Sequence, residues 1–301
     1  MTGLFSTLTK NFLPWYNGTD YLKRMFLSER VDYMPQKIVL VAGASSGLGR
    51  AAAQCLAADG HVVYAAARSF AAGAEPPTGC RALALDVSDA DSVRAAVDTV
   101  LREQGRIDAL VCCAASFTMS PMEELPIDTL ADMMNVTFLG MARCVQAVMP
   151  AMRAQKSGHI VLFSSLNGLF SIPFQGAYSA TKHAVEAYGE ALAQETLGMG
   201  IHVTVVEPGD CRGGSQKYRR VYLAENSPYA VAFKQGTGKI HHDESSGLPP
   251  ERVGRAVAKA VGKANPPARL VVASLDQRSA VWMHKFLPRK LFNRIIAAYY
   301  R

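Results

Sequence analysis

Short apolar runs alternate with longer amphipathic stretches from about residue 37 onward. The first run, KIVLVAG at 37–43, is almost continuously apolar and ends in glycine, which is typical of a parallel strand buried on both faces. The next stretch, GRAAAQCLAADG at 49–60, is rich in alanine and ends at Gly60, which predicts a helix. The pattern therefore begins with a strand, a turn and a helix.

The same alternation continues along the chain. Further apolar runs predict strands in HVVYAAAR (61–68), RALALDV (81–87), DALVCCAA (108–115), HIVLFSS (159–165), HVTVVEP (202–208) and RLVVAS (269–274). Helical patterns lie between most of them, near 89–104, 128–153, 177–198 and 250–264. Such alternation requires right-handed crossovers and predicts an α/β fold, a doubly wound parallel sheet in three Rossmann-like layers.

The domain limits follow from this pattern. We predict a single domain at 37–275, preceded by an extension at 1–36 and followed by a basic amphipathic extension at 276–301. The segment at about 210–249 is rich in glycine and charged residues.

Composition narrows the class of protein. The chain has 301 residues, 49% of them hydrophobic, and its six cysteines show no metal-ligand spacing, so we expect a reduced globular protein without a metal. Nowhere do about 18 uncharged apolar residues run together, which argues against secretion and a transmembrane span. We expect a cytoplasmic protein.

Charge adds one distinctive feature at the C-terminus. The net charge is +7, but the basic residues are otherwise dispersed and no nucleic-acid-binding motif is present, so we expect no nucleic-acid partner. Residues 278–301 combine aromatic and aliphatic side chains with basic ones and contain no acidic residue. This pattern suits peripheral contact with an anionic membrane, and it suits equally well packing across a subunit interface or over the substrate pocket. We expect a homo-oligomer, a dimer or tetramer.

A glycine-rich turn connects the first strand to the first helix. The turn GASSGLG contains Gly43, Gly47 and Gly49, with Ser45, Ser46 and Leu48 between them. Glycine lets the backbone turn sharply and approach a pyrophosphate, and the following helix N-terminus offers unpaired N–H groups. The turn therefore predicts a dinucleotide-binding site.

At this point the chain resembles the short-chain dehydrogenase/reductase family over about residues 37–275. The motifs GASSGLG, LDVSD, SS…YSATK and EPG occur in the family's order and spacing. The resemblance implies a Rossmann-like fold and a catalytic set of Ser165, Tyr178 and Lys182. It also implies that the cofactor is contacted by Tyr178, Lys182, Cys113, Ala114, Pro208 and Gly209.

The chemistry of the catalytic set can be argued from the residues. A free tyrosine has a pKa near 10, so Tyr178 needs a neighbouring cation to exchange a proton at neutral pH. Lys182 lies one helical turn away and supplies that charge. Ser165, at a strand end, is placed to hydrogen-bond the substrate oxygen while a hydride moves to or from the nicotinamide.

The end of the second strand indicates which cofactor binds. Enzymes that prefer NAD usually have an acidic residue there, whereas this chain has Ala67 followed by Arg68. An arginine suits the 2′-phosphate, so we predict NADP(H). Asp86 and Val87 resemble the family's adenine contacts, and the alternative for Asp86 is a helix cap.

Two motifs depart from the family. CCAA, residues 112–115, replaces the usual N-N-A-G, so the two amides are absent and Ala115 adds a methyl group beside the expected ribose path. In VTFLG, residues 136–140, Thr137 replaces the asparagine that positions a proton-relay water. Either the relay is rebuilt around the Thr137 hydroxyl, which makes Thr137 a candidate catalytic residue, or turnover is slow.

The sequence thus predicts an NADP(H)-dependent oxidoreductase that interconverts a ketone and a secondary alcohol on a hydrophobic small molecule. Two alternatives remain: a catalytically weak NADP(H)-binding scaffold or redox sensor, and a non-redox isomerase, dehydratase or cyclase. The resemblance also implies that the segment at about 210–249 forms a lid over the substrate. Its basic residues Lys217, Arg219 and Arg220 either meet an acidic or phosphopantetheine-bearing substrate or form a solvated loop, and the solvated loop is the favoured interpretation.

Overall fold

The computed structural model describes residues 35–212 and 218–301. The extension at 1–34 and residues 213–217, which include Lys217, lie outside the described residues. Gln36–Arg301 form one compact unit, to which the C-terminal extension belongs.

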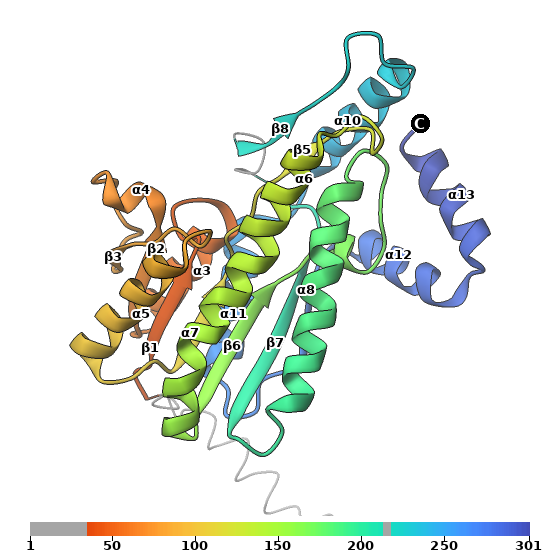
Figure 1. Cartoon of the computed structure of the whole chain (residues 1–301). Coiled ribbons are helices and arrows are strands. Elements are labelled where there is room, and N and C mark those ends of the chain that lie inside the picture. Colours follow the sequence, from red (N-terminus) through yellow and green to blue (C-terminus); the bar gives the residue numbers. More distant parts are fainter. Residues whose placement is uncertain (1–34, 213–217) are drawn as a thin grey trace, which may run out of the picture. The chain divides into compact units, whose positions relative to one another are not determined.

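Seven parallel strands form the central sheet in the order β3-β2-β1-β4-β6-β7-β9 (Figure 1). The strands are β1 (Ile38–Ala42), β2 (Val62–Ala67), β3 (Arg81–Ala84), β4 (Ala109–Cys112), β6 (Gly158–Phe163), β7 (Ile201–Pro208) and β9 (Arg269–Val272). Each strand coincides with an apolar run that predicted it, although β6 and β7 begin one residue earlier than their runs. The doubly wound parallel sheet is therefore confirmed.

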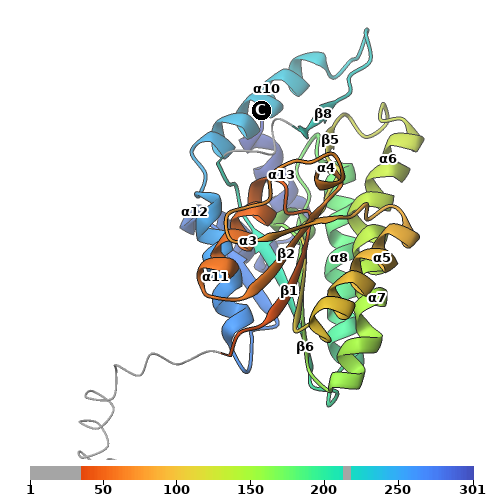
Figure 2. The same ribbon diagram turned by 90° about the vertical axis from the view of Figure 1, so that its left-hand side faces the viewer.

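Helices cover both faces of the sheet (Figure 2). They are α3 (Gly47–Ala58), α5 (Ala90–Gln104), α7 (Gly140–Gln155), α8 (Gly176–Glu195) and α11 (Pro250–Gly262). Alternate residues of β1 serve the two faces: Leu40 belongs to the apolar core under α5, α7 and α8, and Val41 to the core under α3 and α11. Burial on both faces explains why the strands read as continuous apolar runs.

The stretch predicted as one helix near 128–153 contains a break. It consists of α6 (Ile127–Met134), a single π-helical turn (Asn135–Leu139) and α7. The π turn contains Thr137, whose side chain is buried. Such turns are frequent at functional sites, and the helical periodicity of the sequence gives no sign of one.

The lid and the C-terminal extension have secondary structure of their own. A short parallel pair joins β5 (Thr118–Met119) to β8 (Arg220–Val221), and the lid continues into α10 (Ala230–Ser245). Beyond β9 the chain forms α12 (Leu275–Phe286) and α13 (Arg289–Tyr299), which lie at one side of the molecule in Figure 1. None of the helices in the described part of the chain is long and apolar enough to cross a membrane.

Candidate active site

The glycine turn brings three backbone segments close together. A Cβ atom on Gly49 would lie 2.2 Å from the Gly43 carbonyl oxygen, and one on Gly43 would lie 2.4 Å from the Ala114 amide nitrogen. Gly43 also has a φ of 86°, which disfavours other residues. Only glycine fits at these two positions, so the turn after β1 is packed directly against the end of β4.

The start of α3 is suited to an anion. Ser46 occupies the N-cap without a side-chain capping hydrogen bond, and the first turn contains no acidic residue. The positive end of the helix dipole is thus not compensated by a carboxylate. Ser45 is exposed beside it, while Leu48 packs toward the core under α3. These residues fit the pyrophosphate of a dinucleotide.

The residues expected around the adenosine lie at the ends of β2 and β3. Arg68 begins the short helix α4 (Arg68–Ala71), is exposed, and makes no hydrogen bond or ion pair within residues 35–212 and 218–301. Asp86 accepts hydrogen bonds from the Ser88 amide and hydroxyl, which lower the pKa of Asp86. The N-cap of α5 is Asp89, so the helix-cap alternative for Asp86 is wrong.

The CCAA motif gives the site a buried thiol. Burial raises the pKa of the Cys113 thiol, despite the opposing effect of nearby Lys182. A hydrogen bond with Cys144, together with burial, raises the pKa of Cys112. Both thiols are therefore protonated at neutral pH and unreactive, and all six cysteines of the chain are free. The described residues contain no group of side chains able to hold a metal ion.

Ser165, Tyr178 and Lys182 come together at the carboxyl end of the sheet. Ser165 follows β6, and the other two lie one turn apart on α8. The Lys182 Nζ atom lies 5.6 Å from the centre of the Tyr178 ring and donates a hydrogen bond of 2.7 Å to the Phe163 carbonyl oxygen. The Ser165 hydroxyl accepts a hydrogen bond of 3.2 Å from the Asn167 amide, which fixes its position.

The electrostatics of the set are dominated by burial. Burial raises the pKa of Tyr178 to about 12, while a hydrogen bond with Ser165 and the charge of Arg219 act in the opposite direction. Burial also lowers the pKa of Lys182 to about 8. In the structure, Ser165 and Arg219 thus favour the Tyr178 phenolate. The same role for the Lys182 ammonium is the prediction made from the sequence.

The π turn places Thr137 against the loop after β4. The Thr137 hydroxyl accepts a hydrogen bond of 3.0 Å from the Ser116 amide. The side-chain oxygen of Asn135 is occupied by Arg143, whose Nη2 donates to it at 2.8 Å. Thr137 therefore anchors the chain next to Phe117, and Asn135 is directed to a different neighbour.

Three further residues, Pro208, Gly209 and Val87, were predicted to contact the cofactor. Pro208 ends β7, and its carbonyl oxygen lies 3.5 Å from the Ser165 hydroxyl, which donates to it. The Gly209 amide donates to the Val272 carbonyl oxygen at 3.0 Å, so this segment is held between β6 and β9. Val87 follows β3 at the opposite edge of the sheet, where it is buried and packs against Gly140.

The sequence did not predict the side chains that stack on Tyr178, the candidate catalytic tyrosine. The Phe117 ring lies 4.4 Å from the Tyr178 ring, centre to centre, and the Arg219 guanidinium lies 4.4 Å from the centre of Phe117. The Arg219 side chain is only 2% exposed and forms an ion pair with Glu244 of α10. The solvated-loop interpretation is therefore wrong for Arg219, which connects the lid to the site.

The neighbouring arginine behaves differently. The Arg220 side chain is 54% exposed and its Nη2 donates to Asp132 at 2.6 Å. Arg219 lies directly before β8, and the side chains of the two neighbouring residues point to opposite sides of this extended segment, Arg219 inward and Arg220 outward. The strand signal in this part of the sequence is too weak for that alternation to be recognised.

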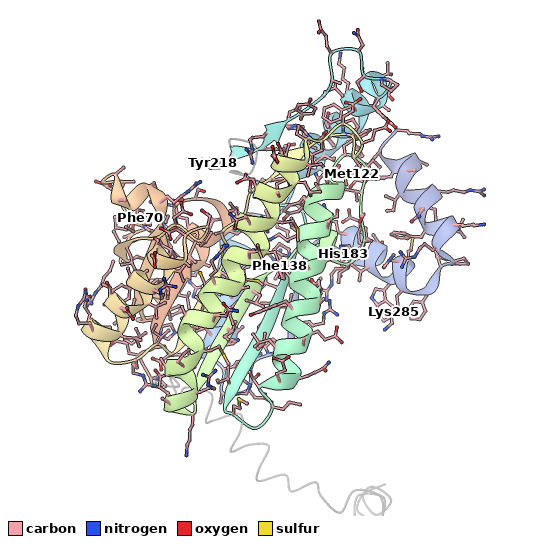
Figure 3. All side chains as sticks on the ribbon, viewed as in Figure 1. Phe70, Met122, Phe138, His183, Tyr218 and Lys285 are labelled. Carbon is pink, nitrogen blue, oxygen red and sulfur yellow. The ribbon has the colours of Figure 1, made fainter. Side chains whose placement is uncertain are left out.

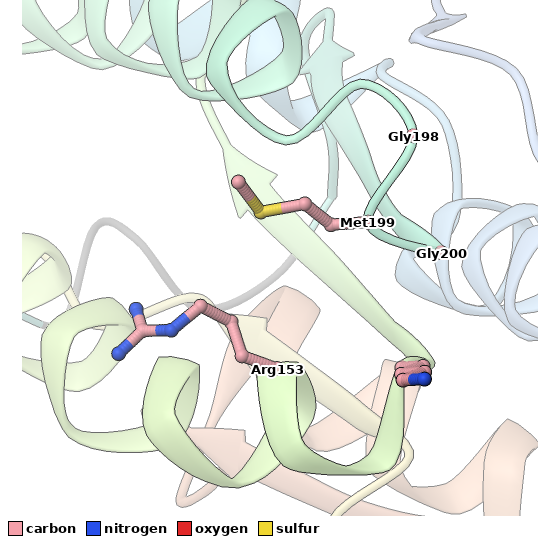
Figure 4. Close-up of a pocket in the computed structure, with 5 residues that line it drawn as sticks. Arg153, Gly198, Met199 and Gly200 are labelled. Atoms are coloured by element: carbon pink, nitrogen blue, oxygen red, sulfur yellow. The ribbon is translucent and has the colours of Figure 1, made fainter.

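A hollow in the surface near α8 is lined by Pro121, Met122, Glu123, Pro173, Phe174 and Tyr229. Met122, labelled in Figure 3, packs close to Gly176, two residues before Tyr178. A second hollow (Figure 4) is lined by Arg153, Lys156 and the turn at Gly198–Gly200, directly before β7. It lies at the amino end of the strand, whereas the catalytic set lies at the carboxyl ends. Only the first hollow is thus near the chemistry.

Comparison with known proteins agrees with this geometry. The sequence model of the short chain dehydrogenase family matches residues 37–221. The chain is 36% identical to 3-ketodihydrosphingosine reductase of Bacteroides thetaiotaomicron, over 89% of this chain and 99% of that protein. It is also 36% identical to human 17-beta-hydroxysteroid dehydrogenase type 1, over 58% of this chain and 57% of that protein.

A solved structure shows the same fold. The short-chain dehydrogenase from Streptomyces avermitilis superposes with a TM-score of 0.72 at 32% identity, over 83% of this chain and 93% of that chain. The chain belongs to the short-chain dehydrogenase/reductase family, whose members are oxidoreductases that use nicotinamide cofactors.

Proposed function

We propose that this protein is an NADP(H)-dependent reductase that converts a ketone into a secondary alcohol on a long hydrophobic substrate. The observation that carries the proposal is the position of Tyr178. Its side chain lies near Ser165 and Lys182 and also contacts Phe117, which packs on an apolar cluster. A proton donor is thus placed where a polar catalytic set meets an apolar wall.

The preference for NADP(H) rests on the end of β2. Ala67 offers no carboxylate to the ribose hydroxyls, and an acidic residue at this place is what usually favours NAD. Arg68 is exposed next to it, and its side chain makes no hydrogen bond or ion pair within the described part of the chain. Its guanidinium is available for bidentate binding of a 2′-phosphate.

The residues of the chain would divide the reaction as follows. The bound cofactor supplies the hydride. Ser165, held by the Asn167 amide, donates a hydrogen bond to the substrate oxygen and polarises the carbonyl. Tyr178 gives its phenolic proton to that oxygen as the alcohol forms. Lys182, whose Nζ atom lies 5.6 Å from the centre of the Tyr178 ring, would bind the nicotinamide ribose and favour the phenolate.

The substrate class follows from the apolar wall. The cluster around Phe117 includes the buried or half-buried side chains of Met119, Leu166, Leu169, Phe170, Phe174 and Phe233. It joins the loop after β4, the segment after β6 and α10 of the lid. A surface of this kind suits a hydrocarbon chain more than a small polar ketone. The names of the two relatives, a 3-ketodihydrosphingosine reductase and a 17-beta-hydroxysteroid dehydrogenase, support the same class.

The test is steady-state oxidation of NADPH and NADH with a series of ketones of increasing chain length, including 3-ketodihydrosphingosine. We expect NADPH to be preferred. We also expect kcat/KM to rise roughly three- to fourfold per methylene until the apolar wall is covered, because each buried methylene contributes about 0.8 kcal/mol.

Two results would contradict the proposal. Tight NADPH binding without turnover of any ketone would favour the scaffold alternative. Conversion of substrate without NADPH oxidation, seen by product analysis, would favour the non-redox alternative.

A further inference from the structure

The last two helices expose large apolar side chains to solvent. The structure shows exposed apolar side chains on α12 and α13 at Leu275, Trp282, Phe286, Leu291, Ile295 and Tyr299. Leu275 is 85% exposed, Phe286 66% and Trp282 62%. So many exposed apolar residues within one short segment are unusual for a surface that faces only water.

The exposed residues of α12 form a stripe. Leu275, Trp282 and Phe286 are seven and four residues apart, which places them within about 40° of one another around the helix. The Trp282 and Phe286 rings stack with their centres 5.4 Å apart and their planes 10° apart. The aromatic pair is therefore an ordered, continuous apolar surface.

Basic side chains flank the stripe. Arg278 and Lys285 are exposed on the same side of α12, and Figure 3 shows Lys285 pointing away from the protein. On α13, Lys290 and Arg294 are exposed beside Leu291 and Ile295. We call the exposed residues of 275–301 the C-terminal surface. Residues 278–301 carry six lysines and arginines and no acidic residue.

The fold does not need the C-terminal surface. The opposite face of the two helices packs inward, where Phe292 is 2% exposed and lies 5.4 Å from Phe170 and 4.9 Å from His284, ring centre to ring centre. The hairpin is thus fixed to the apolar cluster near the active site by its inner face. In the described part of the chain, the apolar cluster that holds Phe170 and Phe292 does not include Trp282, Phe286, Leu291 or Ile295. Tyr299 contacts Lys239 and Asp243 of α10.

We propose that the C-terminal surface docks the protein on an anionic membrane surface. Aromatic side chains such as Trp282 favour the level of the lipid headgroups, and lysine and arginine are attracted to anionic lipids. Since the inner face of the same hairpin contacts the apolar cluster of the site, docking places that cluster close to the bilayer. The inference concerns binding alone and holds whatever ketone the enzyme reduces.

A second copy of this chain is a less suitable partner. A symmetric dimer through the C-terminal surface would bring the same basic residues of both copies together, because a two-fold axis pairs like patches. In each copy the six positive side chains of residues 278–301 outnumber the one exposed acidic side chain of this surface, Asp276, so the two patches would repel each other. An anionic bilayer provides the opposite charge over the whole surface.

The test is co-sedimentation of the full chain with phosphatidylcholine vesicles, with and without phosphatidylserine. We expect binding to vesicles that contain phosphatidylserine, weakened by added salt. The double variant Trp282→Ser/Phe286→Ser should bind at least tenfold more weakly. Arg278→Glu/Lys285→Glu should lose at least about fivefold per residue on phosphatidylserine vesicles.

The matched control is Leu197→Ser, which removes a side chain that is 79% exposed at the end of α8. It should bind vesicles like the parent protein. All variants should reduce a water-soluble ketone at the parent rate, which separates loss of docking from misfolding and from failure of the proposed reaction.

Equal sedimentation of the parent and the Trp282→Ser/Phe286→Ser variant would overturn the proposal. So would a parent protein that ignores phosphatidylserine vesicles but forms a dimer which the same variant dissociates, measured by sedimentation velocity.

Discussion

Replacing Arg219 with methionine tests whether the lid acts on the catalytic tyrosine by charge. The two 4.4 Å steps through Phe117 place the guanidinium within about 9 Å of the Tyr178 ring. A unit charge at that distance is worth about 0.5 kcal/mol at the dielectric constant of water and about 1.8 kcal/mol at an effective value of 20. One pKa unit is about 1.4 kcal/mol.

Glu244 reduces the effect of Arg219 in the parent protein, because its charge raises the pKa of Tyr178. In Arg219→Met the guanidinium, which lowers the pKa of Tyr178, is lost, while the Glu244 carboxylate, which raises it, stays. We expect the pKa of Tyr178 to rise by roughly half a unit to one unit. Reduction uses the protonated phenol, so it should persist to higher pH. Alcohol oxidation uses the phenolate, so it should slow roughly three- to tenfold at pH below that pKa.

The assay is the pH profile of kcat/KM in both directions. Arg219→Lys keeps the charge and should restore most of the parent profile. Arg220→Met is the matched control, because that side chain is 54% exposed and directed to Asp132. Profiles that coincide for the parent, Arg219→Met and Arg220→Met would refute electrostatic action of Arg219. Equal shifts in both methionine variants would assign the effect to general loosening of the lid.

Three further changes test other parts of the account. Arg68→Ala should weaken NADPH binding at least tenfold more than NADH binding, since only NADPH has the 2′-phosphate, and calorimetry showing equal losses would contradict this. Thr137→Val should lower the free energy of unfolding by about 1 kcal/mol, because the Ser116 amide loses its acceptor; Thr137→Ser should not, as denaturant titration can show. Phe292→Ala should lower the free energy of unfolding by about 3–5 kcal/mol, and a change below 1 kcal/mol would mean that α13 is not part of the core.

The sequence predicted the parts of the fold that depend on local pattern. The apolar runs identified all seven strands of the sheet. Inner strands such as β1 and β4 are buried on both faces and must be apolar throughout, whereas the edge strand β3 is largely exposed. The glycine turn was also predictable, since Gly43 and Gly49 stand where a side chain cannot fit. The separation of Tyr178 and Lys182 by one helical turn placed them correctly on one helix.

The parts that sequence reasoning missed depend on contacts between distant segments. Arg219 is buried where the chain directly before β8 lies on Phe117, about a hundred residues earlier in the chain, and β8 itself pairs with β5. The π turn around Thr137 inserts one residue into an otherwise regular helix, which leaves the apolar pattern almost unchanged. Asp86 was given a cap as its alternative role, although three residues further on Asp89 performs it.

The most direct test of the central claim is the turnover of Tyr178→Phe with NADPH and an accepted long-chain ketone. The variant keeps the ring that stacks on Phe117, so the fold by circular dichroism and the affinity for NADPH by fluorescence titration should match the parent. The account predicts a fall in kcat of at least about 100-fold, because the phenylalanine has no proton to give to the substrate oxygen. A folded variant that binds NADPH and reduces the ketone at the parent rate would show that Tyr178 is not the acid and would contradict the proposed reaction.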